Sequence, residues 1–126
     1  MKIGFDLHGV LDNPKVSPFF SIISRLLIDE GHEIHIITGA EDTPTLRDEL
    51  RRSGVKWTHI FSITDYHKEL GTPIIRDELG RPWMDPEIWN PAKGEYAMRV
   101  GIDIHFDDSF TYGKFFQTTY CCVMNG

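Results

Sequence analysis

Hydrophobic residues in this chain gather in short runs that alternate with stretches of helical periodicity. The short runs predict strands at residues 2–7, 32–38, 55–63, 102–107 and 118–124. Between the first two runs, the apolar side chains from Phe19 to Leu27 recur three or four positions apart, which predicts a helix with one buried face. The chain therefore alternates strand with helix over most of its length.

Helix starts are marked by polar residues that precede a proline. Such pairs occur at Ser17-Pro18, Thr43-Pro44 and Asn90-Pro91, and they predict helices that end near Gly31, Gly54 and Gly101. Shorter helices are predicted at residues 64–70 and 109–116. Residues 73–85 predict a hairpin that turns near Leu79-Gly80 and exposes aromatic side chains such as Trp83.

Strands separated by helices predict one α/β domain over residues 1–126, with residues 63–92 as a small hairpin-like insertion, or flap. The expected fold is doubly wound and Rossmann-like, with a parallel five-stranded sheet and helices on both faces. In such sheets the ligand lies beyond the carboxyl ends of the strands, where the strand order reverses. Asp6, Thr38 and the pair Asp107-Asp108 end predicted strands, so we expect them to meet there.

Composition and charge exclude several classes of function. The 126 residues include 13 basic and 19 acidic side chains, a net charge of -6, which gives no basic surface for nucleic acid. Polar side chains interrupt the apolar stretch 19–28, which argues against a membrane span, and the N-terminus shows no signal-peptide pattern. The adjacent Cys121 and Cys122 would point to opposite faces of a strand, so we expect reduced thiols in a cytoplasmic protein.

The polar strand ends carry residue types that suit phosphoryl transfer. A carboxylate such as that of Asp6 can attack phosphorus or bind Mg²⁺. A hydroxyl and an ammonium group, as on Thr38 and Lys93, stabilise the phosphoryl oxygens. Further carboxylates, as on Asp107 and Asp108, hold the cation that lets an anionic nucleophile approach an anionic substrate.

Four segments, taken in order, resemble the motifs of the haloacid dehalogenase superfamily. Residues 6–11 (DLHGVL) resemble motif I, and residues 34–39, which end in Thr38-Gly39, resemble motif II. Lys93, just inside a predicted helix, matches the lysine of motif III, and residues 106–108 (FDD) match the acidic motif IV. The resemblance extends from Met1 to about Ser109.

This resemblance implies a Mg²⁺-dependent phosphohydrolase, a phosphomonoesterase for a small phosphorylated substrate such as a nucleotide or a sugar phosphate. Asp6 would be the nucleophile and would form an aspartyl phosphate that water then hydrolyses. Mg²⁺ would be held by Asp6, the backbone carbonyl of His8 and Asp107, with Asp108 as an alternative ligand or a positioning group.

The same resemblance assigns the substrate-binding groups. Thr38, Gly39 and Lys93 would bind the phosphoryl oxygens. Gly9 would let the loop turn sharply and bring backbone N–H groups to the phosphate.

One position departs from the family pattern. The family's phosphatases carry a second Asp two residues after the nucleophile, where this chain has His8. Imidazole can donate and accept protons near neutral pH, although it is longer than a carboxylate. Two functions therefore stay open. In one, His8 acts as acid and base in a working phosphatase; in the other, the chain is a catalytically weak or inactive protein that binds phosphate or nucleotide or regulates a partner.

The flap at residues 63–92 holds Arg76, Arg81, Trp83 and Trp89. These side chains suit a clamp on a nucleotide or a sugar phosphate, and they equally suit tryptophans that pin the flap to the body. An open site would also accept a partner subunit as its lid, so an oligomer is compatible with the sequence. The remaining histidines show no metal-ligand spacing, and we expect them at the surface or hydrogen-bonded in strands: His32, His35, His59, His67 and His105.

Overall fold

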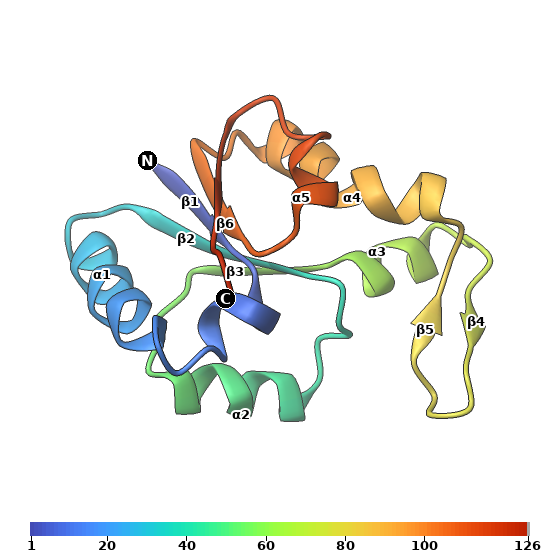
Figure 1. Ribbon diagram of the computed structural model, residues 1–126, viewed down its shortest axis with the longest axis horizontal. Coiled ribbons are helices and arrows are strands. Elements are labelled where there is room, and N and C mark those ends of the chain that lie inside the picture. Colours follow the sequence, from blue (N-terminus) through green and yellow to red (C-terminus); the bar gives the residue numbers. More distant parts are fainter. Residues whose placement is uncertain (126) are drawn as a thin grey trace.

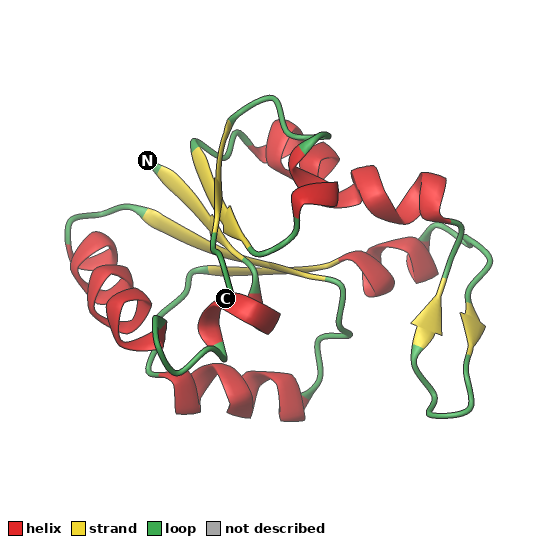
Figure 2. Cartoon of the chain, viewed as in Figure 1, coloured by secondary structure: helices red, strands yellow, loops and turns green. Residues whose placement is uncertain are grey.

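Five parallel strands form a central sheet in the order β3-β2-β1-β6-β7, which confirms the predicted fold class (Figures 1 and 2). The computed structural model describes residues 1–125. The strands of this sheet are β1 (Lys2–Phe5), β2 (Glu33–Thr38), β3 (His59–Ser62), β6 (Ile104–Asp107) and β7 (Thr119–Cys122). The helices are α1 (Ser17–Asp29), α2 (Pro44–Ser53), α3 (Ile63–Glu69), α4 (Pro86–Val100) and α5 (Phe110–Gly113).

Helices cover both faces of this sheet (Figure 1). On one face, Phe5 of β1 packs in a single core with Phe20 of α1 and Leu50 of α2. On the other face, Phe61 of β3 packs with Tyr96 of α4. The sheet is therefore buried from both sides, as parallel sheets usually are.

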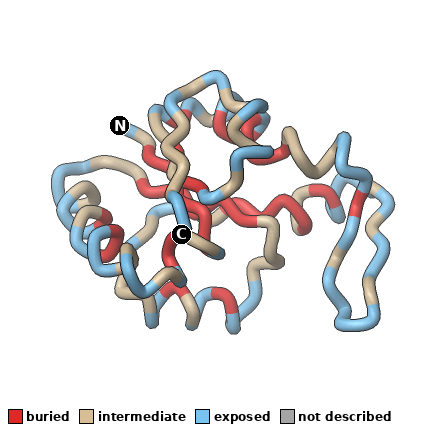
Figure 3. The backbone as a smooth tube through the Cα atoms, viewed as in Figure 1, coloured by how far each residue is buried: buried red, intermediate tan, exposed pale blue. Residues whose placement is uncertain are grey.

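The side chains of strand β2 contribute to two hydrophobic cores, one on each face of the sheet. Ile34 and Ile36 belong to the core beneath α1 and α2, whereas Ile37 belongs to the core beneath α3 and α4. Successive side chains of a strand point to opposite faces, so a strand covered on both faces needs apolar residues at nearly every position. Figure 3 shows the resulting band of buried residues through the middle of the molecule.

Helix α4 begins earlier than the sequence predicts. Its first residue is Pro86, and the Asp85 carboxylate caps it by accepting a hydrogen bond from the backbone N–H of Glu87 at 2.9 Å. The predicted start at Asn90-Pro91 is wrong, because both residues lie inside the helix. Pro91 has no N–H to donate to the carbonyl of Glu87, so the helix lacks this one hydrogen bond.

Two other predicted boundaries also shift. Ser17 is the first residue of α1 and not its cap, because a turn at Asn13, whose carbonyl accepts from Ser17 N–H at 2.9 Å, already leads into the helix. Strand β3 is shorter than the predicted 55–63, because the Thr58 hydroxyl bonds to the backbone of Ile34 just before the ladder begins. The predicted cap Thr43 is confirmed: its hydroxyl accepts from Leu46 N–H at 3.2 Å.

Residues 63–92 contain α3, a two-stranded hairpin of β4 (Ile75–Arg76) and β5 (Pro82–Trp83), and the start of α4. The hairpin, which the sequence predicts, extends away from the sheet (Figure 1). Glu41, in the loop after β2, joins this segment to the body: its carboxylate lies 2.6 Å from Arg76 and 2.9 Å from Lys68. Hydrogen bonds from Arg76 and Lys68 lower the pKa of Glu41 to about 2.

Two imidazoles from neighbouring strands stack near the beginning of β2. His35 and His59 are register partners, with ring centroids 4.2 Å apart and planes only 7° from parallel. Glu33 Oε1 lies 2.8 Å from Nε2 of His35, and the Tyr96 hydroxyl lies 2.7 Å from its Nδ1. Burial lowers the pKa of His35 by more than the Glu33 carboxylate raises it. The folded protein therefore favours the neutral imidazole.

We predict that acid destabilises the protein through His35. A histidine whose pKa is lower in the folded state stabilises the fold above its unfolded pKa of 6.5, and this contribution is lost as the pH falls. The contribution of His35 to the free energy of unfolding should therefore decrease between about pH 7 and pH 5, so the stability of the unmodified protein relative to His35→Gln should fall over this range. Urea unfolding at a series of pH values measures this, and equal pH slopes for the two proteins would argue against it.

Candidate active site

The polar strand ends meet where the order of the strands reverses. Strands β2 and β3 lie on one side of β1, and β6 and β7 lie on the other, so the reversal falls between β1 and β6. Asp6 directly follows β1, and its backbone N–H donates to the carbonyl of Phe106 in β6 at 2.9 Å. Asp107 ends β6, and Thr38 ends the neighbouring β2. The fold thus places these three polar residues at one edge of the sheet.

Lys93, which belongs to α4, contacts the carboxylates of both Asp6 and Asp107. Its Nζ lies 3.0 Å from Asp6 Oδ1 and 2.8 Å from Asp107 Oδ2. Lys93 is only 3% exposed. It lies in the middle of α4 rather than just inside a helix start, because the helix begins at Pro86. A lysine buried in this way is part of the site and not a solvated surface residue.

Burial and neighbouring charges set the protonation of this cluster. Burial raises the pKa of Asp6 to about 7, with the Lys93 ammonium opposing and the Asp107 carboxylate adding to the shift. Burial acts on Asp107 too, but His105 and Lys93 outweigh it and hold the Asp107 pKa below its usual range. Burial alone would lower the pKa of Lys93, and the two carboxylates raise it instead. Asp6 is therefore the member of the cluster that changes protonation near neutral pH.

His105 is a member of the site that sequence reasoning missed. Its Nε2 lies 3.0 Å from Asp107 Oδ2, and both side chains are fully buried. Burial lowers the pKa of His105. Nε2 carries the proton in this contact, because its partner is a carboxylate oxygen, which can only accept. The ring stacks on Phe116 with centroids 4.8 Å apart, which fixes its orientation. The sequence offers one signal for this contact. His105 lies two residues before Asp107 on the same strand, and residues two apart on a strand face the same side.

Gly9 allows the loop after β1 to pass close to Asp108. Within the turn η1 (Leu7–Leu11), Gly9 has a φ of +86°, a conformation that residues with side chains rarely adopt. A Cβ at this position would lie 2.0 Å from Asp108 Oδ2. The Asn125 amide donates to the Gly9 carbonyl at 3.0 Å. Asp108 stays exposed at the rim, in contrast to the buried Asp107.

Thr38 and Gly39 form a second side of the site, against an aromatic wall. The Thr38 hydroxyl accepts from Ala40 N–H at 3.1 Å, which leaves its own proton free to donate. A Cβ on Gly39 would lie 2.4 Å from the indole of Trp89, so only glycine admits this ring. Trp89 Nε1 donates to the Tyr112 hydroxyl at 2.9 Å, and Lys93 Nζ lies 4.8 Å from the centre of the Tyr112 ring.

His8 lies at the rim, where Asp12 orients it. The His8 side chain is 61% exposed, and its Nδ1 lies 3.0 Å from Asp12 Oδ2. The other oxygen of Asp12 accepts from the Gly9 N–H at 2.7 Å. The N–H of Gly9 is therefore engaged within the turn, with Asp12 as its acceptor. When Nδ1–H donates to a carboxylate, Nε2 of the same imidazole remains for proton exchange.

The predicted site residues share one open cleft of about 560 Å³, which we call the polar cleft. Its lining includes Asp6, His8, Gly9, Thr38, Gly39, Lys93 and Asp108. Asp107 alone among the predicted residues is absent from the lining, and it lies beneath Lys93. Oxygens of Asp6, Asp107 and Asp108 lie within 4.8 Å of one another, near enough for one cation to contact all three.

Comparison with known proteins assigns no family to the chain. No protein-family model matches it, and no curated protein does. Among residues 1–125, no helix is long and apolar enough to cross a membrane. The function must therefore be inferred from the polar cleft itself.

We predict that the fold depends on Lys93 more than on Asp6. Lys93→Met leaves the buried Asp107 carboxylate without its cation, which should lower the free energy of unfolding by about 3–5 kcal/mol. Asp6→Asn should change it by about 1 kcal/mol or less, because a carboxyl with a pKa of about 7 is already partly neutral at pH 7.

Urea unfolding at pH 7 compares the two variants. Lys68→Met provides the matched control, because it removes a half-exposed lysine that pairs with Glu41 at the surface and should cost less than about 1 kcal/mol. A Lys93→Met protein that is as stable as the unmodified chain would contradict the buried ion-pair account.

Proposed function

We propose that the protein is a Mg²⁺-dependent phosphohydrolase, a phosphomonoesterase that acts through an aspartyl phosphate on Asp6. The observation that carries the proposal is the contact of Asp6 with Lys93 at the carboxyl ends of β1 and β6, in a cleft open to solvent. A carboxylate beside an ammonium group supplies a nucleophile and a partner for the phosphoryl oxygens. The motifs that resemble those of the haloacid dehalogenase superfamily support the same chemistry.

In this proposal, Mg²⁺ would be held by carboxylates at the carboxyl edge of the sheet. This ion prefers oxygen ligands, and the carboxylates of Asp6, Asp107 and Asp108 offer them within 4.8 Å of one another. By the family resemblance, the backbone carbonyl of His8 would be a further ligand. When bound, Mg²⁺ would offset the negative charge shared by nucleophile and substrate.

In the proposed reaction, a carboxylate oxygen of Asp6 forms a bond to phosphorus as the bond to the ester oxygen breaks. The Lys93 ammonium and the Thr38 hydroxyl donate to the phosphoryl oxygens, and the backbone of Gly39 lies beside them. A water molecule then attacks phosphorus and breaks the bond to Asp6. The products are an alcohol, inorganic phosphate and the free Asp6 carboxylate.

His8 would carry the proton in both steps. As an imidazolium it gives the Nε2 proton to the leaving oxygen, and as a neutral ring it accepts a proton from the attacking water. Asp12 supports this role because its carboxylate holds Nδ1 at 3.0 Å and so fixes the ring. This pair favours a working phosphatase over a protein that only binds phosphate.

Phosphate release tests the proposal directly. With Mg²⁺, the protein should release phosphate from at least one member of a panel of aryl phosphates, nucleoside monophosphates and sugar phosphates, and a chelator should stop the reaction. Asp6→Asn should lower the rate by more than about 10³-fold. Asp103→Asn is the matched control, because Asp103 precedes β6 at the opposite edge of the sheet. No release from any substrate by folded protein would overturn the proposal.

Substitutions of His8 separate proton transfer from binding. His8→Ala should lower the rate by about 10²–10⁴-fold and leave the affinity for inorganic phosphate unchanged. His8→Asp should raise activity well above that of His8→Ala, because it restores the carboxylate of the family pattern. Full activity in His8→Ala would show that another group moves the proton.

A further inference from the structure

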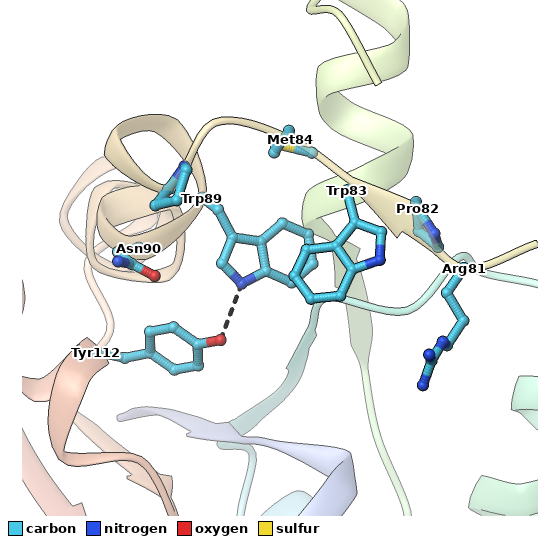
Figure 4. A pocket seen from close by; sticks show the side chains of 8 residues that line it. Arg81, Pro82, Trp83, Met84, Trp89, Asn90 and Tyr112 are labelled. Atoms are coloured by element: carbon cyan, nitrogen blue, oxygen red, sulfur yellow. Dashed lines mark hydrogen bonds between the residues drawn. The ribbon is translucent and has the colours of Figure 1, made fainter. Parts of the chain in front are cut away.

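A second pocket adjoins the polar cleft and shares part of its lining. Figure 4 shows the side chains of this second pocket. This aromatic pocket has a volume of about 440 Å³ and is formed by β5, the start of α4 and α5. Arg81, Pro82, Trp89 and Tyr112 line both the pocket and the cleft. A molecule whose phosphoryl group lies at Lys93 can therefore extend into the pocket.

Aromatic side chains give this pocket flat walls. Trp89 is held in place by its hydrogen bond to Tyr112 and by its contact with Gly39. Trp83 stands on the hairpin, where its Nε1 donates to Asp77 at 3.2 Å, yet it remains 60% exposed. Figure 4 shows the two indoles turned toward the same space. An exposed indole beside a second, fixed indole is suited to stacking against a planar ring.

Polar groups in the pocket favour a nucleobase over a plain hydrocarbon ring. Asn90 contributes a primary amide, which both donates and accepts hydrogen bonds and can pair with the edge of a base. Arg81 is positioned by Asp77, whose carboxylate lies 2.7 Å from its Nε. Its guanidinium can contact a sugar hydroxyl or a phosphate between the two sites.

We propose that the substrate is a nucleoside monophosphate, with its base stacked in the aromatic pocket and its phosphate at Lys93. This inference rests on the proposed phosphohydrolase function. Tyr112 joins the two ends of the site: its ring lies 4.8 Å from Lys93 Nζ and its hydroxyl binds Trp89. The net charge of -6 favours a free mononucleotide over the end of a nucleic-acid strand.

Binding to the Asp6→Asn protein tests the pocket without turnover. In calorimetric titrations with Mg²⁺, adenosine monophosphate should bind at least roughly tenfold more tightly than glycerol 3-phosphate. Trp83→Ala should remove this advantage, whereas Trp83→Phe should keep most of it. Leu79→Ala is the matched control, because Leu79 lies in the same hairpin, is 78% exposed and does not line the pocket.

A substitution outside the hairpin keeps the test valid if Trp83→Ala disturbs the hairpin itself. Asn90→Ala, on α4, should weaken the binding of adenosine monophosphate and leave that of phenyl phosphate unchanged. Equal affinities for adenosine monophosphate and glycerol 3-phosphate would overturn the proposal. Tighter binding of a 5′-phosphorylated oligonucleotide than of the mononucleotide would also overturn it.

Hydrolysis and base recognition can fail separately in this design. Release of phosphate from glycerol 3-phosphate by the unmodified protein tests hydrolysis alone. The affinity of Asp6→Asn for adenosine monophosphate tests base recognition alone. Turnover of both substrates at equal rates, with equal affinities, would leave the phosphatase standing and remove the nucleotide assignment.

Discussion

A buried ammonium group between two carboxylates is the interaction on which the rest of this structure depends. A lysine that is almost entirely excluded from water is stable as a cation only when opposite charge lies in contact with it. Here the charges come from Asp6 and Asp107, at the ends of adjacent strands, and the lysine comes from α4. A shift of one residue along α4 would turn Lys93 by about 100° and break both contacts. Both contacts therefore require that β1 lies beside β6 in the sheet and that Lys93 lies on the face of α4 turned toward these strand ends.

Around this cluster, two glycines leave space that the Cβ of any other residue would fill. Gly9 brings the first loop against Asp108, and Gly39 admits the indole of Trp89 beside Thr38. The result is a site with two ends. One end carries charged and hydroxyl groups suited to a phosphoryl group, and the other is walled by aromatic rings from the hairpin, α4 and α5. The small flap thus extends the cleft without closing it.

The sheet and its polar strand ends could be predicted because alternation, capping and strand-end residues are local signals. The start of α4 could not, since Asp85-Pro86 and Asn90-Pro91 offer the same local pattern, and only the folded chain shows that Ile88 and Trp89 of the added first turn pack against the core. The burial of Lys93 likewise depends on tertiary packing, because its partners Asp6 and Asp107 are distant in the sequence. His105 belongs to no motif, and its role follows from its contact with Asp107, which only the folded strand creates. The aromatic pocket could not be predicted either, because it forms only where the folded hairpin lies next to α4 and α5.

The most direct measurement is to identify the atom that carries the phosphoryl group during turnover. The protein would be mixed with Mg²⁺ and an aryl phosphate, quenched in acid and reduced with borohydride, which converts an aspartyl phosphate to homoserine. Peptide mass spectrometry then locates the modified residue. The account predicts homoserine at residue 6 and nowhere else. Modification at Asp107 or Asp108, or phosphate release with no modified aspartate, would contradict it.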